Sequence, residues 1–179
     1  MIISWRLKYL MALNLFLNKP NKKNPVIKIS KNGSGAKNIL FLLPSVSKTA
    51  RIAAYFVKRD LKKEVRLLDY IVHEDGLSFY PEDMHSNIMT FKNRDLNWTG
   101  ALSNQSIINK IKSVRYDAVV DLNFEVQPAL AIIILKIKAP IKIGFKSKYS
   151  DKLFSLVIEK EVTGFAENQY RIIEKILGL

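Results

Sequence analysis

From residue 38 onward the sequence alternates between short, continuous apolar runs and segments whose apolar residues recur at helical spacing. The predicted strands cover 38–43, 64–68, 87–91, 116–122, 141–145 and 153–158. The first predicted helix begins at Ser47, and three more cover 103–113, 127–139 and 167–177. Continuous apolar runs of this length are typical of parallel strands that are buried on both faces. The alternation therefore predicts an α/β fold with a Rossmann-like, doubly wound and mostly parallel sheet.

The chain divides into a short amino-terminal part and a larger body. Residues 18–35 are polar and contain two prolines and two glycines, which predicts a linker. We therefore expect residues 1–36 to form a helix followed by a polar linker, and residues 37–179 to form the Rossmann-like domain. With 179 residues, of which 48% are hydrophobic, the chain is long enough to bury the core of one domain.

Residue types that many kinds of site require are scarce or absent. The chain has no cysteine, which excludes a disulfide framework, thiol nucleophiles and thiolate metal sites. Its two histidines, His73 and His85, do not make a histidine-rich metal site. No grouping of serine, histidine and acid stands out, so no catalytic residue is assigned. We expect neither a bound metal nor a cofactor.

The positive charge is concentrated near the amino terminus. The formal net charge is +13, and residues 1–59 contain twelve Lys or Arg and no Asp or Glu. Such a field attracts phosphate groups, whether on an anionic lipid, a nucleic acid or a phosphorylated ligand. Trp98 with nearby aromatic residues suggests a platform for bases, but the chain lacks an ordered basic stripe. A nucleic acid is therefore the least favoured of these partners.

The first 17 residues predict an amphipathic helix. At about 100° per residue, Trp5, Tyr9 and Phe16 share an apolar face, and Lys8 lies on the polar face. A helix of this kind can lie in a membrane interface, so we predict membrane contact through these four residues. Packing of the helix on its own domain or on a partner subunit is an equal alternative, and a signal peptide is less favoured. The expected location is cytoplasmic, peripheral at the inner membrane.

Ligands of doubly wound sheets bind at the carboxyl ends of the strands. The loop after the first predicted strand offers hydroxyl groups, free helix-start amides and cations that suit a phosphate, with Ser47 as the predicted N-cap. The residues concerned are Ser45, Ser47, Lys48, Thr49 and Arg51. The loop contains no glycine, which disfavours a dinucleotide cofactor. The alternative is a capped helix with solvated lysines.

Two later strand ends carry further candidates. Asp121 and Asn123 follow a buried strand, where a carboxylate can act as a base, bind a sugar hydroxyl or cap the next helix. Lys146 and Lys148 follow the next strand and either face an anionic ligand or form a solvated basic turn. Because carboxyl ends of parallel strands share one edge, the residues of all three loops together predict a site for an acceptor or anion.

The carboxyl-terminal half carries a family resemblance. Its relevant segments are Tyr116–Asn123, Pro128–Ala131, Lys138–Phe145 with its Ala-Pro-x-x-x-Gly-Phe pattern, and Glu167–Gly178 with Leu-Gly near the end. Their order resembles the amino-terminal domain of the lipopolysaccharide heptosyltransferases, glycosyltransferase family nine, over roughly residues 38–179. Short Bacteroidetes-type proteins of unassigned function, which share the Asp95–Trp98 loop, are similar too.

The resemblance implies half of a two-domain GT-B fold, in which the amino-terminal domain binds the acceptor and the missing carboxyl-terminal domain binds the nucleotide sugar. The family's Gly-Asp pair after the first strand, whose carboxylate is the expected base, is replaced here by Ser45–Ala50. We therefore expect an acceptor-binding domain that is incomplete or inactive alone. A phosphorylated glycolipid and a separate donor-domain subunit are the implied partners. The alternative is a non-catalytic basic module that binds a protein or a nucleic acid.

Overall fold

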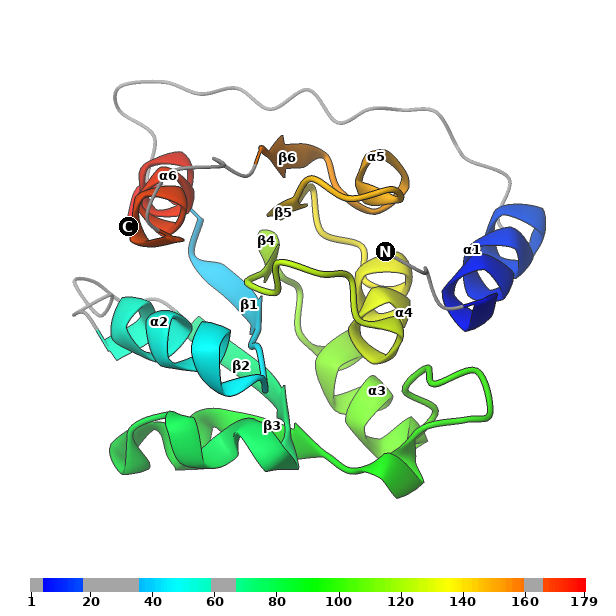
Figure 1. Cartoon of the computed structure of the whole chain (residues 1–179), viewed down its shortest axis with the longest axis horizontal. Helices are drawn as coiled ribbons and strands as arrows, with labels where there is room; N and C mark the ends of the chain where they lie inside the picture. Colours follow the sequence, from blue (N-terminus) through cyan, green and yellow to red (C-terminus); the bar gives the residue numbers. More distant parts are fainter. Residues whose placement is uncertain (1–4, 18–35, 59–66, 160–165) are drawn as a thin grey trace.

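The fold is built on one six-stranded sheet in which every neighbouring pair of strands is parallel. The structure is a computed structural model that describes residues 5–17, 36–58, 67–159 and 166–179 (Figure 1). Along the sheet the order is β3 (Ile88–Phe91), β2 (Leu67–His73), β1 (Asn38–Leu42), β4 (Ala118–Asp121), β5 (Ile141–Phe145) and β6 (Leu156–Ile158). The predicted α/β class and doubly wound, parallel sheet are confirmed.

Helices cover both faces of the sheet (Figure 1). The α-helices are α1 (Trp5–Leu17), α2 (Ser47–Lys58), α3 (Gln105–Ser113), α4 (Pro128–Lys136), α5 (Ser150–Leu153) and α6 (Ala166–Leu177). Three short 3-10 helices, η1 (Glu74–Phe79), η2 (Glu82–Asn87) and η3 (Asn93–Asp95), follow the ends of β2 and β3. Helices α2 and α6 lie on one face, and α3, α4 and α1 lie on the other.

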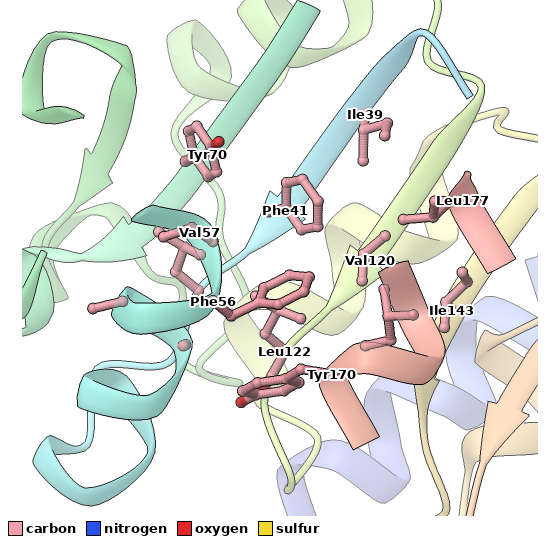
Figure 2. Close-up of a cluster of buried hydrophobic side chains, with 14 of the residues drawn as sticks. Ile39, Phe41, Phe56, Val57, Tyr70, Val120, Leu122, Ile143, Tyr170 and Leu177 are labelled. Atoms are coloured by element: carbon pink, nitrogen blue, oxygen red, sulfur yellow. The ribbon is translucent and has the colours of Figure 1, made fainter. Parts of the chain in front are cut away.

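Alternation along β1 divides its side chains between two hydrophobic cores. Ile39 and Phe41 point to the core under α2 and α6, whereas Leu40 and Leu42 point to the core under α3 and α4. Figure 2 shows the first core, where Phe41 lies near Phe56 with ring centroids 6.2 Å apart. All four β1 residues are fully buried, as expected for a central strand covered on both faces.

Local sequence signals explain where several helices begin and end. The Asn104 side chain accepts hydrogen bonds from the backbone N–H groups of Ser106 and Ile107, so it caps α3. Pro128 opens α4 at a position where no backbone donor is needed. Gly178 has a φ of 67° and ends α6, a conformation that glycine adopts without strain.

Several predicted element boundaries were wrong. The last predicted strand began at Leu153, but Leu153 ends α5 and β6 begins at Leu156. Strand β2 continues to His73 rather than ending at Leu68, because Asp69 interrupts its apolar pattern and is instead satisfied by the Tyr116 hydroxyl, 2.6 Å away. The predicted residues 64–66 lie outside the described residues. Ser47 is the first residue of α2 and not its N-cap, because the Val46 carbonyl already accepts from the backbone N–H of Ala50 at 2.8 Å. The predicted linker at 18–35 lies outside the described residues, so the domain boundary near residue 36 stays a prediction.

Helix α1 exists, but the side chains it buries differ from the predicted apolar face. Leu10 and Met11 are buried, and the helix packs against α4. Trp5 and Tyr9 are exposed at 60% and 44%, and Lys8 is exposed as well. The alternative prediction, that the helix packs on its own domain, is therefore confirmed for the side of α1 that carries Leu10 and Met11. In the part of the chain that the structure describes, no helix has the length and apolar character needed to cross a bilayer.

Candidate functional site at the carboxyl edge of the sheet

The strand order reverses between β1 and β4. From β1 the chain continues outward to β2 and β3, whereas from β4 it continues outward in the opposite direction to β5 and β6. The connections that follow β1 and β4 therefore leave in opposite directions and open a crevice beyond the carboxyl ends of these strands. In open α/β sheets this crevice is where ligands bind.

A cavity of about 330 Å³ occupies this position. Its walls come from the carboxyl ends of β1, β2 and β3, the segment after β4, the loop before α3 and the first turn of α4. Its polar lining residues are Arg6, Ser45, His73, Asn93, Thr99, Asn123 and Gln127. Gly100, at the rim, has a φ of 78°, a conformation that glycine adopts without strain. The cavity thus gathers neutral hydrogen-bonding groups from five segments of the chain and the charged Arg6 from α1.

Beneath the cavity, Asp121 holds Asn123 in place. The Asp121 carboxylate oxygen Oδ1 accepts hydrogen bonds from the backbone N–H and the Nδ2 of Asn123, at 3.0 and 2.8 Å. The same Nδ2 also donates to the Leu42 carbonyl at 3.3 Å, which ties the β4 end to β1. Burial raises the pKa of Asp121 to about 7, against the lowering effect of the Asn123 hydrogen bonds. Asp121 therefore acts on the cavity through Asn123.

His73 forms the wall at the end of β2. The backbone N–H of Asp75 donates to His73 Nδ1 at 3.3 Å, and the Asp75 carboxylate oxygen Oδ2 lies 3.2 Å from the same nitrogen. The other ring nitrogen, Nε2, lies 3.2 Å from Asn93 Oδ1 and can donate a hydrogen bond to it. The Phe91 ring stands edge-on to the imidazole at 5.2 Å. His73 therefore fixes the orientation of the Asn93 amide, which leaves its NH₂ group as a donor.

Arg6 is the one permanently charged side chain among the described residues that line the cavity. It comes from α1, far from the rest of the site in sequence, and its guanidinium also lies 5.9 Å from the centre of the Trp5 ring. A guanidinium presents several donors in a fixed fork and suits a carboxylate or phosphate. Arg6 gives an otherwise neutral cavity its preference for an anionic group.

An exposed aromatic cluster borders the cavity on the α1 side. Trp98 is 63% exposed, and its ring centroid lies 6.0 Å from that of Trp5 and 5.3 Å from that of Tyr9. The loop that carries Trp98 is held by Asn97 Oδ1, which accepts from the backbone N–H and hydroxyl of Thr99 at 3.0 and 2.6 Å. The cluster thus combines an ordered loop with a helix from the other end of the chain.

The structure separates the predicted site residues into two groups. Ser45 and Asn123 line the cavity and Asp121 lies beneath it, so these two strand ends do meet at one rim. The other predicted residues lie outside the described lining, namely Ser47, Lys48, Thr49, Arg51, Lys146 and Lys148. Thr49 donates its hydroxyl to the Val46 carbonyl at 3.0 Å, and Lys146 faces Asp151 at 3.7 Å. A role for this second group in binding anions stays a prediction.

Several lining residues were missed by the sequence analysis. His73 lies at the end of β2, so the rule that selected Ser45 and Asn123 also selects His73 once that strand is correctly bounded. Asn93 follows β3, whose end was already predicted at Phe91, so the same rule could have selected it. Arg6 carries no such signal, because its place depends on how α1 packs. Within the described ranges, no three His, Asp or Glu side chains lie close enough together to hold a metal ion.

Comparisons with known proteins agree with this architecture. The sequence matches a family of unknown function (DUF6913) over residues 11–175. No curated protein matches it. The fold is similar to two solved structures of the E. coli heptosyltransferase WaaC, one with ADP-2-deoxy-2-fluoro heptose and one with ADP. In each the TM-score is 0.56 at 15% identity, over 79% of this chain and 48% of the WaaC chain.

The chain thus spans about half the length of the enzyme that it resembles. At this identity the likeness shows the fold alone, a Rossmann-like domain similar to half of a GT-B glycosyltransferase. The predicted resemblance to heptosyltransferases is confirmed at the level of the fold.

Proposed function

This chain belongs to the DUF6913 family, and from its fold and its cavity we propose that it is an acceptor-binding domain of the glycosyltransferase type. The observation that carries the proposal is the cavity at the point where the strand order reverses, lined by neutral polar groups and Arg6. Amide and hydroxyl groups suit the hydroxyls of a sugar, and Arg6 suits a phosphate or carboxylate on it. The ligand is a phosphorylated sugar, such as the headgroup of a glycolipid in lipopolysaccharide synthesis.

Transfer requires a nucleotide-sugar site as well. The described lining of the cavity contains no carboxylate that could serve as a base, and Asp121 lies beneath the lining. Because this chain corresponds to 48% of the WaaC chain, we propose that a separate donor-domain subunit completes the catalytic unit. Mixing the chain with such a subunit and a labelled nucleotide sugar tests this, since transfer must require both proteins.

Binding of the acceptor is tested with the purified chain by calorimetry. A panel of hexose and heptose phosphates is compared with the free sugars and with inorganic phosphate. We expect Arg6→Gln to weaken binding of the sugar phosphates by about tenfold or more, because a charge-assisted hydrogen bond contributes roughly 1.5–3 kcal/mol. Arg171→Gln, which removes one exposed charge on α6 outside the cavity, is the matched control. Equal losses in the two variants, or no loss in either, would contradict the proposal.

A second observation bears on where such an acceptor would be met. The aromatic cluster of Trp5, Tyr9 and Trp98 is exposed beside the cavity, with Lys8 exposed on the same helix. Amphipathic aromatic rings near cationic side chains favour the headgroup region of a membrane. We propose that this cluster rests on an anionic membrane surface and brings the cavity to a membrane-borne acceptor. The side chain of Phe16, which belongs to the same prediction, lies outside the described residues.

Membrane contact is measured by co-sedimentation with vesicles that contain phosphatidylglycerol. Trp98→Ala should reduce binding by about tenfold or more, because burying an aromatic ring at the interface contributes on the order of 1.5–3 kcal/mol. Tyr55→Ala is the control, since Tyr55 is 65% exposed but lies on α2 on the other face of the sheet. The same binding by both variants would remove the membrane part of the proposal and leave the acceptor site standing.

A non-catalytic binding module is the competing function. It is favoured by the Ser45–Ala50 loop, where the resemblance would place a carboxylate base. If no donor subunit and no nucleotide sugar yields transfer while sugar phosphates still bind in the cavity, the binding module is the correct description.

A further inference from the structure

We propose a second anion site at the opposite, amino edge of the sheet, which binds a multiply charged ligand of the phosphate class. A hollow of about 410 Å³ lies between the carboxyl-terminal ends of α3 and α4 and the turns that lead into β4 and β5. Four cationic side chains line it, namely Lys112, Arg115, Lys136 and Lys138. All four are exposed to solvent.

The charges of this hollow are not balanced by the described residues. No Asp or Glu lines it, and none of its four cations forms an ion pair with a carboxylate in the described part of the chain. Asp117, which follows Arg115 closely in sequence, uses its carboxylate to accept the backbone N–H groups of Lys37 and Asn38 at 2.9 and 3.0 Å. Four like charges around one hollow repel each other, and a bound anion relieves that repulsion.

Cations at helix carboxyl termini have an ordinary explanation, since they offset the partial negative charge of the last carbonyls. Here several of those carbonyls already have other partners. The Ile134 carbonyl accepts from Lys142 Nζ, and the Ile133 carbonyl accepts from the backbone N–H of Ile137 at 3.0 Å. At the end of α3, the Lys110 carbonyl accepts from the Ser113 hydroxyl at 2.8 Å. Part of each helix end is therefore satisfied without the four cations that line the hollow.

The side chains indicate the class of ligand. Arg115 can hold two oxygens of a phosphate at once, and the three lysines add point charges around it. The hollow presents no exposed aromatic ring for a base or sugar to stack on. A diphosphate or triphosphate fits this chemistry, either free in solution or as the phosphate headgroup of a lipid.

This site is independent of the cavity described above. The cavity lies at the carboxyl ends of the strands, and the hollow lies where β4 and β5 begin, so the length of the sheet separates them. No residue lines both. The inference therefore stands whether or not the cavity binds a sugar.

The test uses the full chain and two probes, pyrophosphate in solution and vesicles that contain phosphatidic acid. The site variant is Lys112→Gln, Arg115→Gln, Lys136→Gln and Lys138→Gln combined. The control variant removes the same charge at four exposed cations that line neither the cavity nor the hollow, through Arg94→Gln, Lys152→Gln, Arg171→Gln and Lys175→Gln. Calorimetry, backbone-amide NMR shifts and vesicle co-sedimentation are run at roughly 0.05 and 0.15 M salt, which changes screening strongly. Thermal melting checks that both variants are folded.

We expect saturable binding of one probe that the site variant weakens by about tenfold or more and that the control variant leaves within about twofold. Site-dependent binding of pyrophosphate identifies a free ligand, and site-dependent binding of vesicles alone identifies a lipid headgroup. In the NMR titration, shifts at residues 112–115 and 136–138 with none near Asn123 support the second site. Equal weakening in both variants, or no binding of either probe, overturns the inference.

Discussion

The two edges of the sheet offer different chemistry for anionic ligands. At the carboxyl edge, amides and hydroxyls surround a cavity whose one permanent charge among the described residues is Arg6, above the buried carboxyl of Asp121. At the amino edge, four exposed cations surround a hollow with no acidic residue. Neutral, oriented groups select a ligand by shape and hydrogen bonding, whereas exposed charges attract it in a salt-dependent way. We therefore expect the carboxyl edge to respond to pH and the amino edge to respond to salt.

The largest effect that distinguishes the two edges concerns Asp121. Its pKa rises from 3.8 to about 7 on burial, so the folded chain holds a proton that the unfolded chain releases between about pH 4 and 7. The contribution of Asp121 to stability is therefore full below about pH 4, falls as the pH rises to about 7, and is lost above that. The shift corresponds to roughly 4 kcal/mol.

Asp121→Asn should abolish this pH dependence, because the amide has no proton to lose and its oxygen can still accept from Asn123. Urea unfolding at pH 5 and pH 8 measures it. A variant whose free energy of unfolding declines between these pH values as steeply as that of the wild type would show that Asp121 is not the group responsible. Lys136→Gln, at the amino edge, serves as the control and should leave the slope unchanged.

A smaller effect is expected from Gly76, which supports the cavity wall. A Cβ added to Gly76 would lie 2.6 Å from the Cα of Ser45, closer than atoms can pack, so either η1 or the Ser45 loop must move. We expect Gly76→Ala to lower the free energy of unfolding by about 1–3 kcal/mol, as overpacking in a core does. Sugar-phosphate binding at the carboxyl edge should weaken, and pyrophosphate binding at the amino edge should not.

Chemical denaturation measures the expected loss of stability, and the two binding assays measure the expected change at each edge. Gly100→Ala is a second variant at the same rim. Its φ of 78° strains the backbone with any side chain, although the atom nearest to an added Cβ, Pro128 Cβ, is 3.8 Å away. If Gly76→Ala changed binding equally at both edges, the edges would not be independent.

The smallest effect is expected at the amino edge itself. Replacing Lys112 and Lys136 by Gln removes two of four mutually repelling charges, so the free energy of unfolding should rise by no more than about 0.5 kcal/mol. The increase should vanish near 1 M salt, where the screening length is only about 3 Å. Thermal melting at low and high salt measures it. A decrease at low salt would mean that these lysines make favourable contacts with the protein.

Part of the site could be predicted because strand ends are visible in the sequence. Ser45 and Asn123 were found by asking which polar residues follow buried apolar runs, and both line the cavity. His73 was missed because Asp69 and Tyr70 obscure the apolar pattern of β2, and the predicted strand ended five residues too early, at Leu68. Asp69 is compatible with a buried strand only because the Tyr116 hydroxyl donates to it. That partner lies 47 residues away in sequence.

The sequence alone determined the class of fold. The spacing of apolar residues predicts the alternation of buried strands with covering helices, because each residue's burial depends on its position within its own strand or helix. The tertiary structure decided which strand ends meet, that Arg6 enters the cavity, that Trp98 joins Trp5 and Tyr9, and that α3 and α4 end beside one another. These contacts depend on strand order and on the packing of segments that are distant in the sequence, so local sequence periodicity does not predict them.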